Sequence, residues 1–397
     1  MSSFIGTNIV DDGLVFHYDM KNTHKSWKGK PTTSFFTNGH FQGGNKIPQE
    51  SGSNAQNDII LKPNPGDSAW CLKQTMGVQA TEYEIQVTGL QPSTTYVLSG
   101  WYAQDPDYTG DSRMFHSRFI SASGAHNSLG SGIGTKIGDS VFIDGLDWSY
   151  RYETLTTPAD ATGAGYWYVG YQNLAYTGAR YYTNLQLEEG TYPSPFVSGT
   201  RSNTEAIVDL TGNATITNND VTYNQDGTFN FNGGTQRLSI SNNIGPINNH
   251  FTISAWVKSY DVVPAQNILS MNGPYFMRIV SSKVRFNIYT NSEWLFKNGT
   301  TTLNSNQWYY FTMRWNGTTG YWDGFINDKQ EFSTLKGGVL GGAGGVSSFY
   351  GYVGYTPQGG EQADFSGEIP HVKYYNRALS DAEILQNFEA TRHLYGL

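Results

Sequence analysis

The chain has 397 residues, 38% hydrophobic and 15% charged, so it is long enough for two or three globular domains with cores of their own. Its net charge is −8, and its 25 Lys and Arg residues are spread without a basic run, which excludes nucleic acid as the expected partner. The single cysteine, Cys71, excludes an intrachain disulfide and is expected to be a small core residue.

Glycine, tyrosine and turn dipeptides indicate the fold class. The chain has 46 Gly, 27 Tyr and nine Asn-Gly or Asp-Gly pairs, which is typical of many short strands joined by tight turns. We therefore predict an all-β protein. The start lacks the basic head and apolar stretch of a signal peptide, and no run of about 18 apolar residues occurs, so we expect synthesis in a host cytoplasm without membrane insertion.

Alternating apolar residues predict strands along most of the chain. In order, the expected strands cover residues 13–20, a hairpin at 83–101, and then 251–258, 306–317 and 324–328. Such alternation is typical of sandwich strands with one face toward the opposite sheet.

One helix is expected near the C-terminus. Ser380 is an N-cap candidate, and Glu383 three residues later completes a capping box. The helix is predicted from Asp381 to about Leu394, and it is expected to pack through three apolar side chains, Ile384, Leu385 and Phe388.

Two segments from opposite ends of the chain resemble one family. Residues 366–375, followed by Asn376-Arg377-Ala378-Leu379-Ser380 and the helix, resemble the end of a concanavalin A-like (laminin G-like) jelly roll. Residues 13–19 resemble the first strand of the same family. The family's next segment is missing after Trp27 and is found instead at residues 207–213. The resemblance implies a domain that binds sugars or cell surfaces, and the interruption predicts a second domain inserted in one of its loops.

Residues 33–200 are expected to be the inserted domain. Their first and last strands, residues 34–41 and 181–190, resemble those of carbohydrate-binding-module-like (galactose-binding-like) jelly rolls. We therefore expect two β-sandwich (jelly-roll) domains, one inserted in the other, with a short C-terminal helix. The concanavalin A-like/laminin G-like domain then consists of residues 1–32 and 201–397.

The exit from the insert resembles a further group of proteins. Leu187-Glu188-Glu189-Gly190, then Pro195-Phe196-Val197 and Gly199-Thr200-Arg201, precede the laminin G-like part. This combination resembles structural proteins of tailed bacteriophages. It implies a virion protein, either a capsid decoration or a head or tail fibre component.

No pattern of catalytic residues is found. Retaining glycoside cleavage needs two carboxyl groups about 5 to 5.5 Å apart. Glu82 and Glu84 are more simply a solvated strand face, and the adjacent Glu188 and Glu189 would point to opposite faces. Neither Gly-x-Ser-x-Gly nor His-Glu-x-x-His occurs. We expect no enzyme activity and no cofactor, while a glycan-processing enzyme with carboxylates from distant strands stays an alternative.

A calcium site is left open by the sequence. Carbohydrate-binding-module jelly rolls often hold an ion between their first and last strands, but His40 and Thr183-Asn184 depart from the usual ligands. Asp105, Asp107 and Asp111 surround a glycine turn with a spacing that begins like a calcium loop but lacks its closing Glu. They form either a calcium site or a plain solvated loop.

Exposed aromatic residues are the expected binding groups, because a flat ring stacks on the apolar face of a pyranose while neighbouring amides and carboxylates take its hydroxyls. Alternation places two tyrosines of residues 165–171 on one strand face. Further along, one tryptophan lies in a polar stretch and a Tyr-Trp pair lies near a turn. The candidate carbohydrate-binding residues are Tyr166, Tyr168, Trp294, Tyr321 and Trp322.

These features predict a non-catalytic phage virion structural protein that displays lectin-like domains for adhesion to glycans or a host surface. Its expected partners are other virion proteins and glycans or the host cell surface, and its expected location is the virion. The alternative is a purely structural virion protein whose surfaces bind neighbouring subunits. A homo-oligomer is left open, since no coiled coil or collagen-like stalk is found.

Overall fold

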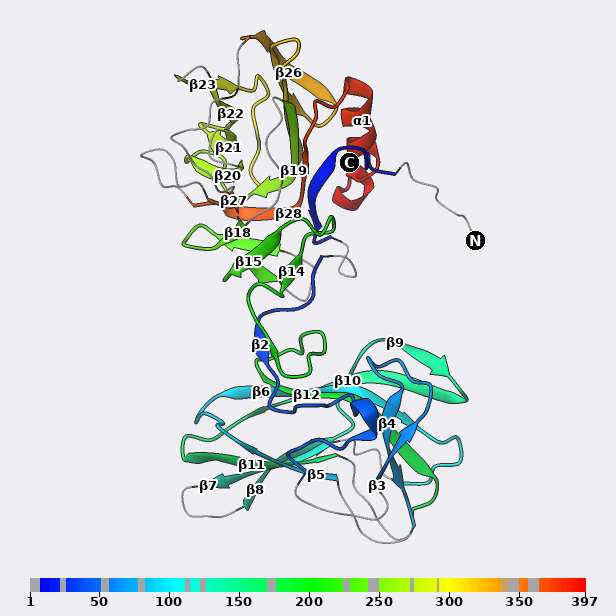
Figure 1. Ribbon diagram of the computed structural model, residues 1–397. Coiled ribbons are helices and arrows are strands. Elements are labelled where there is room, and N and C mark those ends of the chain that lie inside the picture. The colour runs from blue at the N-terminus through cyan, green and yellow to red at the C-terminus, as the bar shows by residue number, and fades with distance from the viewer. Residues whose placement is uncertain are drawn as a thin grey trace. The chain divides into compact units, whose positions relative to one another are not determined.

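A computed structural model describes the chain over the following residues: 8–21, 26–50, 57–77, 83–110, 115–121, 126–169, 176–223, 229–241, 250–271, 275–290, 293–337, 340, 350–355 and 364–397. Over these ranges the protein is all-β apart from helix α1 (Asp381–Glu389) and the 3-10 helices η1 (Gln42–Gly44) and η2 (Arg392–Tyr395) (Figure 1). The predicted fold class is confirmed. No helix in these ranges is long and apolar enough to cross a membrane.

The chain forms two compact units. A discontinuous unit consists of Met1–Lys30 and Ser202–Leu397, and a continuous unit consists of Pro31–Arg201. These divisions lie within two residues of the boundaries expected from the interrupted sequence motif. Each unit is described separately below.

The discontinuous unit is a sandwich of two antiparallel sheets. Sheet 1 contains, in spatial order, β16 (Thr222–Tyr223), β17 (Phe229–Asn232), β28 (Ser366–Tyr375), β19 (His250–Ser259), β24 (Trp308–Asn316), β25 (Tyr321–Ile326) and β26 (Lys329–Leu335), with β1 (Leu14–Asp19) also paired to β28. Sheet 2 contains β14 (Ile207–Val208), β15 (Thr215–Asn219), β18 (Arg237–Ser241), β27 (Tyr350–Val353), β20 (Gln266–Met271), β21 (Tyr275–Val280), β22 (Lys283–Thr290) and β23 (Glu293–Asn298).

One hydrophobic core lies between these sheets. Trp315 and Trp322 of sheet 1 and Phe286 of sheet 2 are completely buried in it. Phe251 of β19 stacks on Tyr275 of β21 with ring centroids 4.2 Å apart, so an aromatic pair joins the two sheets directly. Burying a large apolar side chain contributes about 1.5–3 kcal/mol relative to leaving it exposed, and this core therefore stabilises the unit.

Strand β1 comes from the N-terminal segment but pairs with the C-terminal strand. The pairing with β28 is antiparallel and runs from Leu14 opposite Tyr375 to Asp19 opposite His371. The strand expected at residues 13–20 thus lies in the sheet formed by the C-terminal part of the chain. The whole continuous unit is inserted in the chain between these two paired strands.

Helix α1 begins at the predicted capping box. The Ser380 hydroxyl accepts a hydrogen bond from the Glu383 N–H, and the Glu383 carboxylate accepts one from the Ser380 N–H over 2.7 Å. The helix ends at Glu389, earlier than the sequence predicted, and η2 follows it.

The buried face of α1 is narrower than expected. Ile384 and Phe388 are buried, and Phe388 stacks against Trp256 of β19 with ring centroids 5.7 Å apart. Leu385 is 44% exposed, so the prediction that it packs against the unit is wrong. Residues four apart share a helix face, whereas the next residue lies about 100° around the axis.

The continuous unit contains two main sheets and one separate pair of short strands. Sheet 3 contains β3 (Asn57–Leu61), β4 (Trp70–Thr75), β12 (Ala179–Glu189), β6 (Thr95–Gln104), β10 (Leu146–Thr156) and β9 (Thr135–Ile143). Sheet 4 contains β5 (Tyr83–Thr88), β11 (Ala161–Val169), β7 (Phe115–Ser121) and β8 (His126–Gly132), and a separate pair joins β2 (Thr32–Thr33) to β13 (Thr200–Arg201).

Side chains from both sheets fill the core of this unit. Trp167 of β11 and Leu185 of β12 are completely buried there. Cys71 is buried as predicted, and burial raises the pKa of its thiol to about 12, although Lys62 and Lys73 act in the opposite direction. Cys71 is therefore a packing residue and not a reactive thiol.

Strands β5 and β6 do not form the predicted hairpin. β5 belongs to sheet 4 and β6 to sheet 3, so the turn between them passes from one sheet to the other. Leu90 in this turn is buried, and the Gln91 N–H donates a hydrogen bond to the Tyr96 hydroxyl over 2.7 Å. Alternation predicts where strands lie but not which strand each one pairs with.

Candidate functional site

The five candidate aromatic residues do not form one site. Tyr166 and Tyr168 lie on β11 of the continuous unit, whereas Trp294 lies on β23 of sheet 2. Tyr321 and Trp322 lie on β25 of sheet 1. Trp294 and Tyr321 are each 43% exposed, Tyr166 is half-buried, and the other two are buried.

The expectation that Trp322 is exposed is wrong. It lies opposite Trp315 on the core side of sheet 1, and its ring packs against Phe332 with centroids 5.1 Å apart. Tyr321 is the first residue of the same strand and stays exposed. Because successive side chains on a strand point to opposite faces, nearness to a turn does not give both residues the same exposure.

Of the two candidate tyrosines on β11, one is buried. Trp167 and Val169 point into the core of the continuous unit. Tyr166 and Tyr168 share the other face, but Tyr168 is only 6% exposed, so the idea of an exposed ring at this position is wrong. Alternation assigns side chains to faces without showing what covers each face.

Trp294 belongs to a larger group of side chains on the outward face of sheet 2. Strands β21, β22 and β23 are neighbours in sheet 2 (Figure 1). They pair so that Phe276 lies opposite Asn287, Asn287 opposite Phe296, and Tyr289 opposite Trp294. The alternate residues of β21 and β22 are buried in the core: Tyr275, Met277, Ile279, Val284, Phe286 and Ile288. The outward group is called here the aromatic-arginine face and consists of Phe276, Arg278, Arg285, Tyr289, Trp294 and Phe296.

The Trp294 ring is supported by two other rings. Its centroid lies 5.5 Å from that of Phe276, with 62° between the planes, and 5.1 Å from that of Tyr289, with 56° between the planes. Phe276 is 6% exposed and lies beneath this group. Such pairs are worth about 0.5–1.5 kcal/mol beyond their burial, so the Trp294 ring is held in place while part of it contacts solvent.

Phe296 and two arginines extend the face. Phe296 is 59% exposed, and the Arg285 guanidinium lies 4.6 Å from its ring centroid. Arg285 Nε donates a hydrogen bond to Asn298 Oδ1 over 2.9 Å, which orients the guanidinium. The Arg278 guanidinium lies 6.0 Å from the Phe276 ring. The face therefore combines two solvent-exposed rings with two cationic groups.

This combination suits a sugar ligand. Exposed rings offer a stacking surface for the apolar face of a pyranose, and guanidinium and amide groups donate hydrogen bonds to hydroxyl or carboxylate oxygens. Sequence reasoning found Trp294 and missed the rest. The sequence signal that could have identified this face is the alternation in β22. There Arg285, Asn287 and Tyr289 occupy every second position, and the positions between them are apolar.

Of the candidate calcium residues, Asp105 is bonded to protein groups. Asp105 Oδ2 accepts a hydrogen bond from the Ala179 N–H over 2.9 Å, and its Oδ1 accepts one from the Tyr181 hydroxyl over 3.0 Å. These bonds join the end of β6 to β12. Asp107 is exposed, and Asp111 lies outside the described residues, so the choice between a calcium site and a plain solvated loop stays open.

The neighbouring glutamates do not form a catalytic pair. Glu188 is buried and accepts hydrogen bonds from the Ser194 N–H and the Thr32 hydroxyl over 2.6 and 2.7 Å. Glu189 is exposed, as expected for adjacent residues on a strand. Glu82 lies outside the described residues.

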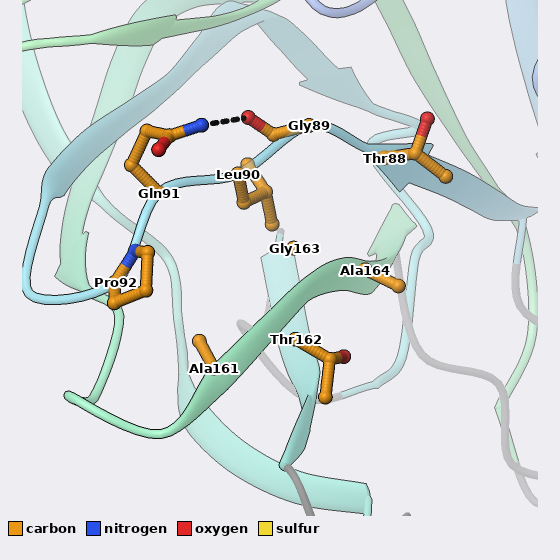
Figure 2. A pocket seen from close by; sticks show the side chains of 9 residues that line it. All are labelled: Thr88, Gly89, Leu90, Gln91, Pro92, Ala161, Thr162, Gly163 and Ala164. Carbon is orange, nitrogen blue, oxygen red and sulfur yellow. Dashed lines mark hydrogen bonds between the residues drawn. The ribbon is translucent and has the colours of Figure 1, made fainter.

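A surface pocket in the continuous unit offers little for recognition. It has a volume of about 470 Å³ and lies between the β5–β6 turn and the start of β11 (Figure 2). Its lining has no charged and no aromatic side chain: Thr88, Gly89, Leu90, Gln91, Pro92, Ala161, Thr162, Gly163 and Ala164. Gln91 Nε2 donates a hydrogen bond to the Gly89 carbonyl oxygen within it. The aromatic-arginine face is the stronger candidate.

A family model for the concanavalin A-like lectin/glucanases superfamily matches residues 232–385. The match includes all of β19 to β28 and most of α1, and so includes the aromatic-arginine face. The superfamily contains both lectins and glucanases, so it leaves open whether a member binds or cleaves glycans. No curated protein matches the chain.

The chain also matches parts of several solved structures at low identity. Botulinum neurotoxin type C, whose cell entry depends on two ganglioside molecules, is 17% identical with a TM-score of 0.36 over 48% of this chain and 50% of the toxin chain. The CBM40 of Ruminococcus gnavus IT-sialidase is 15% identical with a TM-score of 0.31 over 34% of this chain and 80% of its own. The SAP-like pentraxin of Limulus polyphemus is 16% identical with a TM-score of 0.31 over 44% and 80%. The chain thus spans about half the length of the toxin chains it matches.

Proposed function

We propose that this protein is a non-catalytic glycan-binding protein and that the aromatic-arginine face of sheet 2 is its binding surface. The observation that supports this most is the Trp294 ring, which is 43% exposed although Phe276 and Tyr289 hold it in a fixed orientation. A rigid ring loses little conformational freedom when a sugar stacks on it.

The exposed rings occur together. Trp294 and Phe296 lie two residues apart on β23 and therefore on the same face. Single exposed apolar residues need no explanation, but grouped ones rimmed by polar side chains often mark a binding surface. Arg285 beside Phe296 adds a cationic hydrogen-bond donor, which favours glycans that contain acidic groups.

The non-catalytic part of the proposal rests on the carboxylates of this surface. Glu293 is the single carboxylate residue in the three strands that form it, β21, β22 and β23, and as the neighbour of Trp294 it points to the opposite face. A retaining or inverting glycosidase needs two carboxyl groups flanking the scissile bond. The outward face of these strands therefore has no carboxylate of its own and is suited to holding a glycan without cleaving it.

The proposed setting is the virion of a tailed phage, with other virion proteins as partners. The support is the sequence resemblance at residues 187–201, and a decoration or fibre protein would expose many copies whose weak binding adds up through avidity. Mass spectrometry of purified particles from a host that carries the gene tests this setting. Particles without the protein would contradict it.

A glycan array and variants at two positions test the binding function. Trp294→Ala and Phe296→Ala are each expected to weaken binding by about two- to tenfold, because each removes a ring contact worth about 0.5–1.5 kcal/mol. The matched control is Phe142→Ala, which removes a ring that is 75% exposed on β9 of the continuous unit. Circular dichroism checks that each variant is folded.

Three results would contradict the proposal. Glycan binding that is unchanged in a variant with both Trp294→Ala and Phe296→Ala would mean that the site lies elsewhere. No binding to any glycan, together with loss of the variants from assembled particles, would favour the purely structural role. Release of reducing sugar that disappears on changing one carboxylate would favour an enzyme.

A further inference from the structure

A compact group of metal-ligating side chains lies on sheet 1, in the discontinuous unit. Among the residues that the structure describes, His17, Asp19 and His371 place one ligand atom each within 4.8 Å of the others. The strand register explains the group. His17 and Asp19 are two residues apart on β1 and share a face, and Asp19 lies directly opposite His371 of β28.

The two imidazoles are in direct contact. Nε2 of His17 lies 2.8 Å from Nε2 of His371, and the rings are nearly parallel, with centroids 4.9 Å apart and 23° between the planes. At this distance two neutral rings share one proton, since one nitrogen must donate and the other accept. A metal ion that replaced this proton would find both nitrogens already facing each other.

The group is buried. His17, Asp19 and His371 are only 5%, 4% and 2% exposed. On the same face of sheet 1, Trp256 lies opposite His371 and stacks on Tyr395 of η2 with ring centroids 4.1 Å apart. The site is therefore in the interior, where the surrounding side chains control solvent access to the ligands.

The charged groups on this face include Lys373, Lys258, Glu368 and Lys21, whose ammonium lies 5.7 Å from the Trp308 ring and 5.9 Å from the Tyr395 ring. Lys373 lies opposite His17, and its ammonium is 5.6 Å from the Tyr310 ring. Lys258 forms an ion pair with Glu368. A bound dication would thus share this face with several lysines, and the Asp19 carboxylate would offset part of that positive charge.

The protein fixes the backbone around the ligands. The His17 N–H donates a hydrogen bond to Asp209 Oδ1 over 2.9 Å, and the Asp19 N–H donates one to Ser26 Oγ over 2.9 Å. Asp19 Oδ1 accepts a hydrogen bond from the Lys21 N–H over 3.1 Å. Such outer contacts orient ligating side chains, as the surroundings of metal sites commonly do.

We propose that His17, Asp19 and His371 form a binding site for one transition-metal dication, with Zn²⁺ as the best match. Two imidazole nitrogens and one carboxylate oxygen are a common ligand set for Zn²⁺, with water in the fourth position. Ideal bonds of about 2.0–2.1 Å place two nitrogens about 3.3 Å apart in a tetrahedral site, so the histidines need to separate by about 0.5 Å. Ca²⁺ and Mg²⁺ prefer oxygen ligands and fit less well.

The ion would stabilise the discontinuous unit by joining its two segments. His17 precedes the inserted continuous unit and His371 follows it, so the bound metal closes a loop of several hundred residues. Because the metal binds the folded chain, it raises the stability by mass action. This inference is independent of glycan binding.

The test uses the full chain after treatment with a chelator. We expect the protein to bind close to one equivalent of Zn²⁺ by elemental analysis after gel filtration, and Zn²⁺ but not Ca²⁺ to raise its melting temperature. His371→Asn is expected to weaken Zn²⁺ binding by at least about 10- to 100-fold, the loss typical even for residues that only orient a ligand. His393→Asn, which changes an exposed histidine near the C-terminus, is the control.

A second measurement keeps the proposal testable if His371→Asn does not fold. Co²⁺ added to the wild-type protein should give the visible absorption of a tetrahedral site, and Zn²⁺ should remove it. The proposal is wrong if the wild-type protein binds no Zn²⁺ and its melting temperature does not change. It is equally wrong if a folded His371→Asn variant binds Zn²⁺ as the wild type does, or if only His393→Asn loses binding.

Discussion

Single carboxylates hold loops and termini of the discontinuous unit in place. Glu331 of β26 accepts hydrogen bonds from the backbone N–H and the hydroxyl of both Thr300 and Thr301. Burial opposes ionisation of this carboxyl group, but the four hydrogen bonds outweigh it and lower its pKa from 4.5 to about 2. Glu383 behaves similarly, since hydrogen bonds from Arg377 outweigh its burial and lower its pKa to about 2.

These pKa values predict how acid affects stability. The folded-state pKa of Glu331 is lower than the unfolded one, so its contribution is present above about pH 4.5 and is lost as the pH falls toward 2. Glu331→Gln should be less stable than the wild type at pH 7, and this difference should shrink as the pH falls from 4.5 to 2. Urea unfolding at several pH values measures it.

The control for this titration is Glu293→Gln, which removes an exposed carboxylate on β23. Its difference from the wild type should stay small across the same range. A Glu331→Gln difference that is constant from pH 7 to pH 2 would show that the hydrogen bonds to Thr300 and Thr301 do not depend on the charge.

For single residues, the sequence predicted the exposure of Trp294 correctly and that of Trp322 wrongly. Trp294 and Trp322 looked alike, since each lies in a polar stretch or near a turn. Trp322 is buried because the strand partner opposite it is Trp315, and nothing in the local sequence identifies that partner. Trp294 is exposed because β23 is an edge strand of sheet 2. Exposure depends on tertiary pairing, which composition and alternation do not contain.

The C-terminal helix shows what local sequence does determine. Ser380 and Glu383 are three residues apart, and their reciprocal hydrogen bonds form wherever that spacing starts a helix. The start of α1 was therefore predictable. Its end was not predicted correctly, and on both sides of that end Phe388 and Tyr395 pack on Trp256 of a distant strand, a contact that the local sequence does not reveal.

Removing the cap should lower stability measurably. Ser380→Ala removes the hydroxyl that accepts the Glu383 N–H, and such losses typically cost about 1 kcal/mol. Thermal or urea unfolding of the full chain measures the change in the transition of the discontinuous unit. Ser333→Ala, at an exposed position of β26, is the control. An unchanged transition in Ser380→Ala would mean that packing alone holds α1.

The positions of the strands were also predictable from local sequence, but their pairing was not. Residues 83–88 and 95–104 alternate as two strands, and both strands exist. The short connection between these two strands favoured a hairpin. In the structure the connection passes from one sheet to the other, and Leu90 within it is buried in the core. Strand positions follow from periodicity, whereas sheet membership depends on contacts between distant residues.

At the scale of the whole molecule, the continuous unit begins and ends at neighbouring strands. Thr33 of β2 lies opposite Thr200 of β13, and Thr32 lies opposite Arg201. Residues opposite each other in an antiparallel pair have Cα atoms about 4.5–5.5 Å apart. A unit whose two ends are adjacent can be inserted in a surface loop of another domain without separating the strands on either side of that loop.

This arrangement predicts that each unit folds without the other. Replacing residues 31–201 with a short Gly-Ser linker should leave β1 paired with β28, because the core contacts of that pair are within the discontinuous unit. The shortened chain should keep a cooperative melting transition and should bind glycans with the affinity of the full chain, since Trp294 and Phe296 remain. Circular dichroism and the glycan array measure the two properties. A folded but non-binding product would place the glycan site in the continuous unit, and an unfolded one would mean that residues 31–201 are needed to hold β1 against β28.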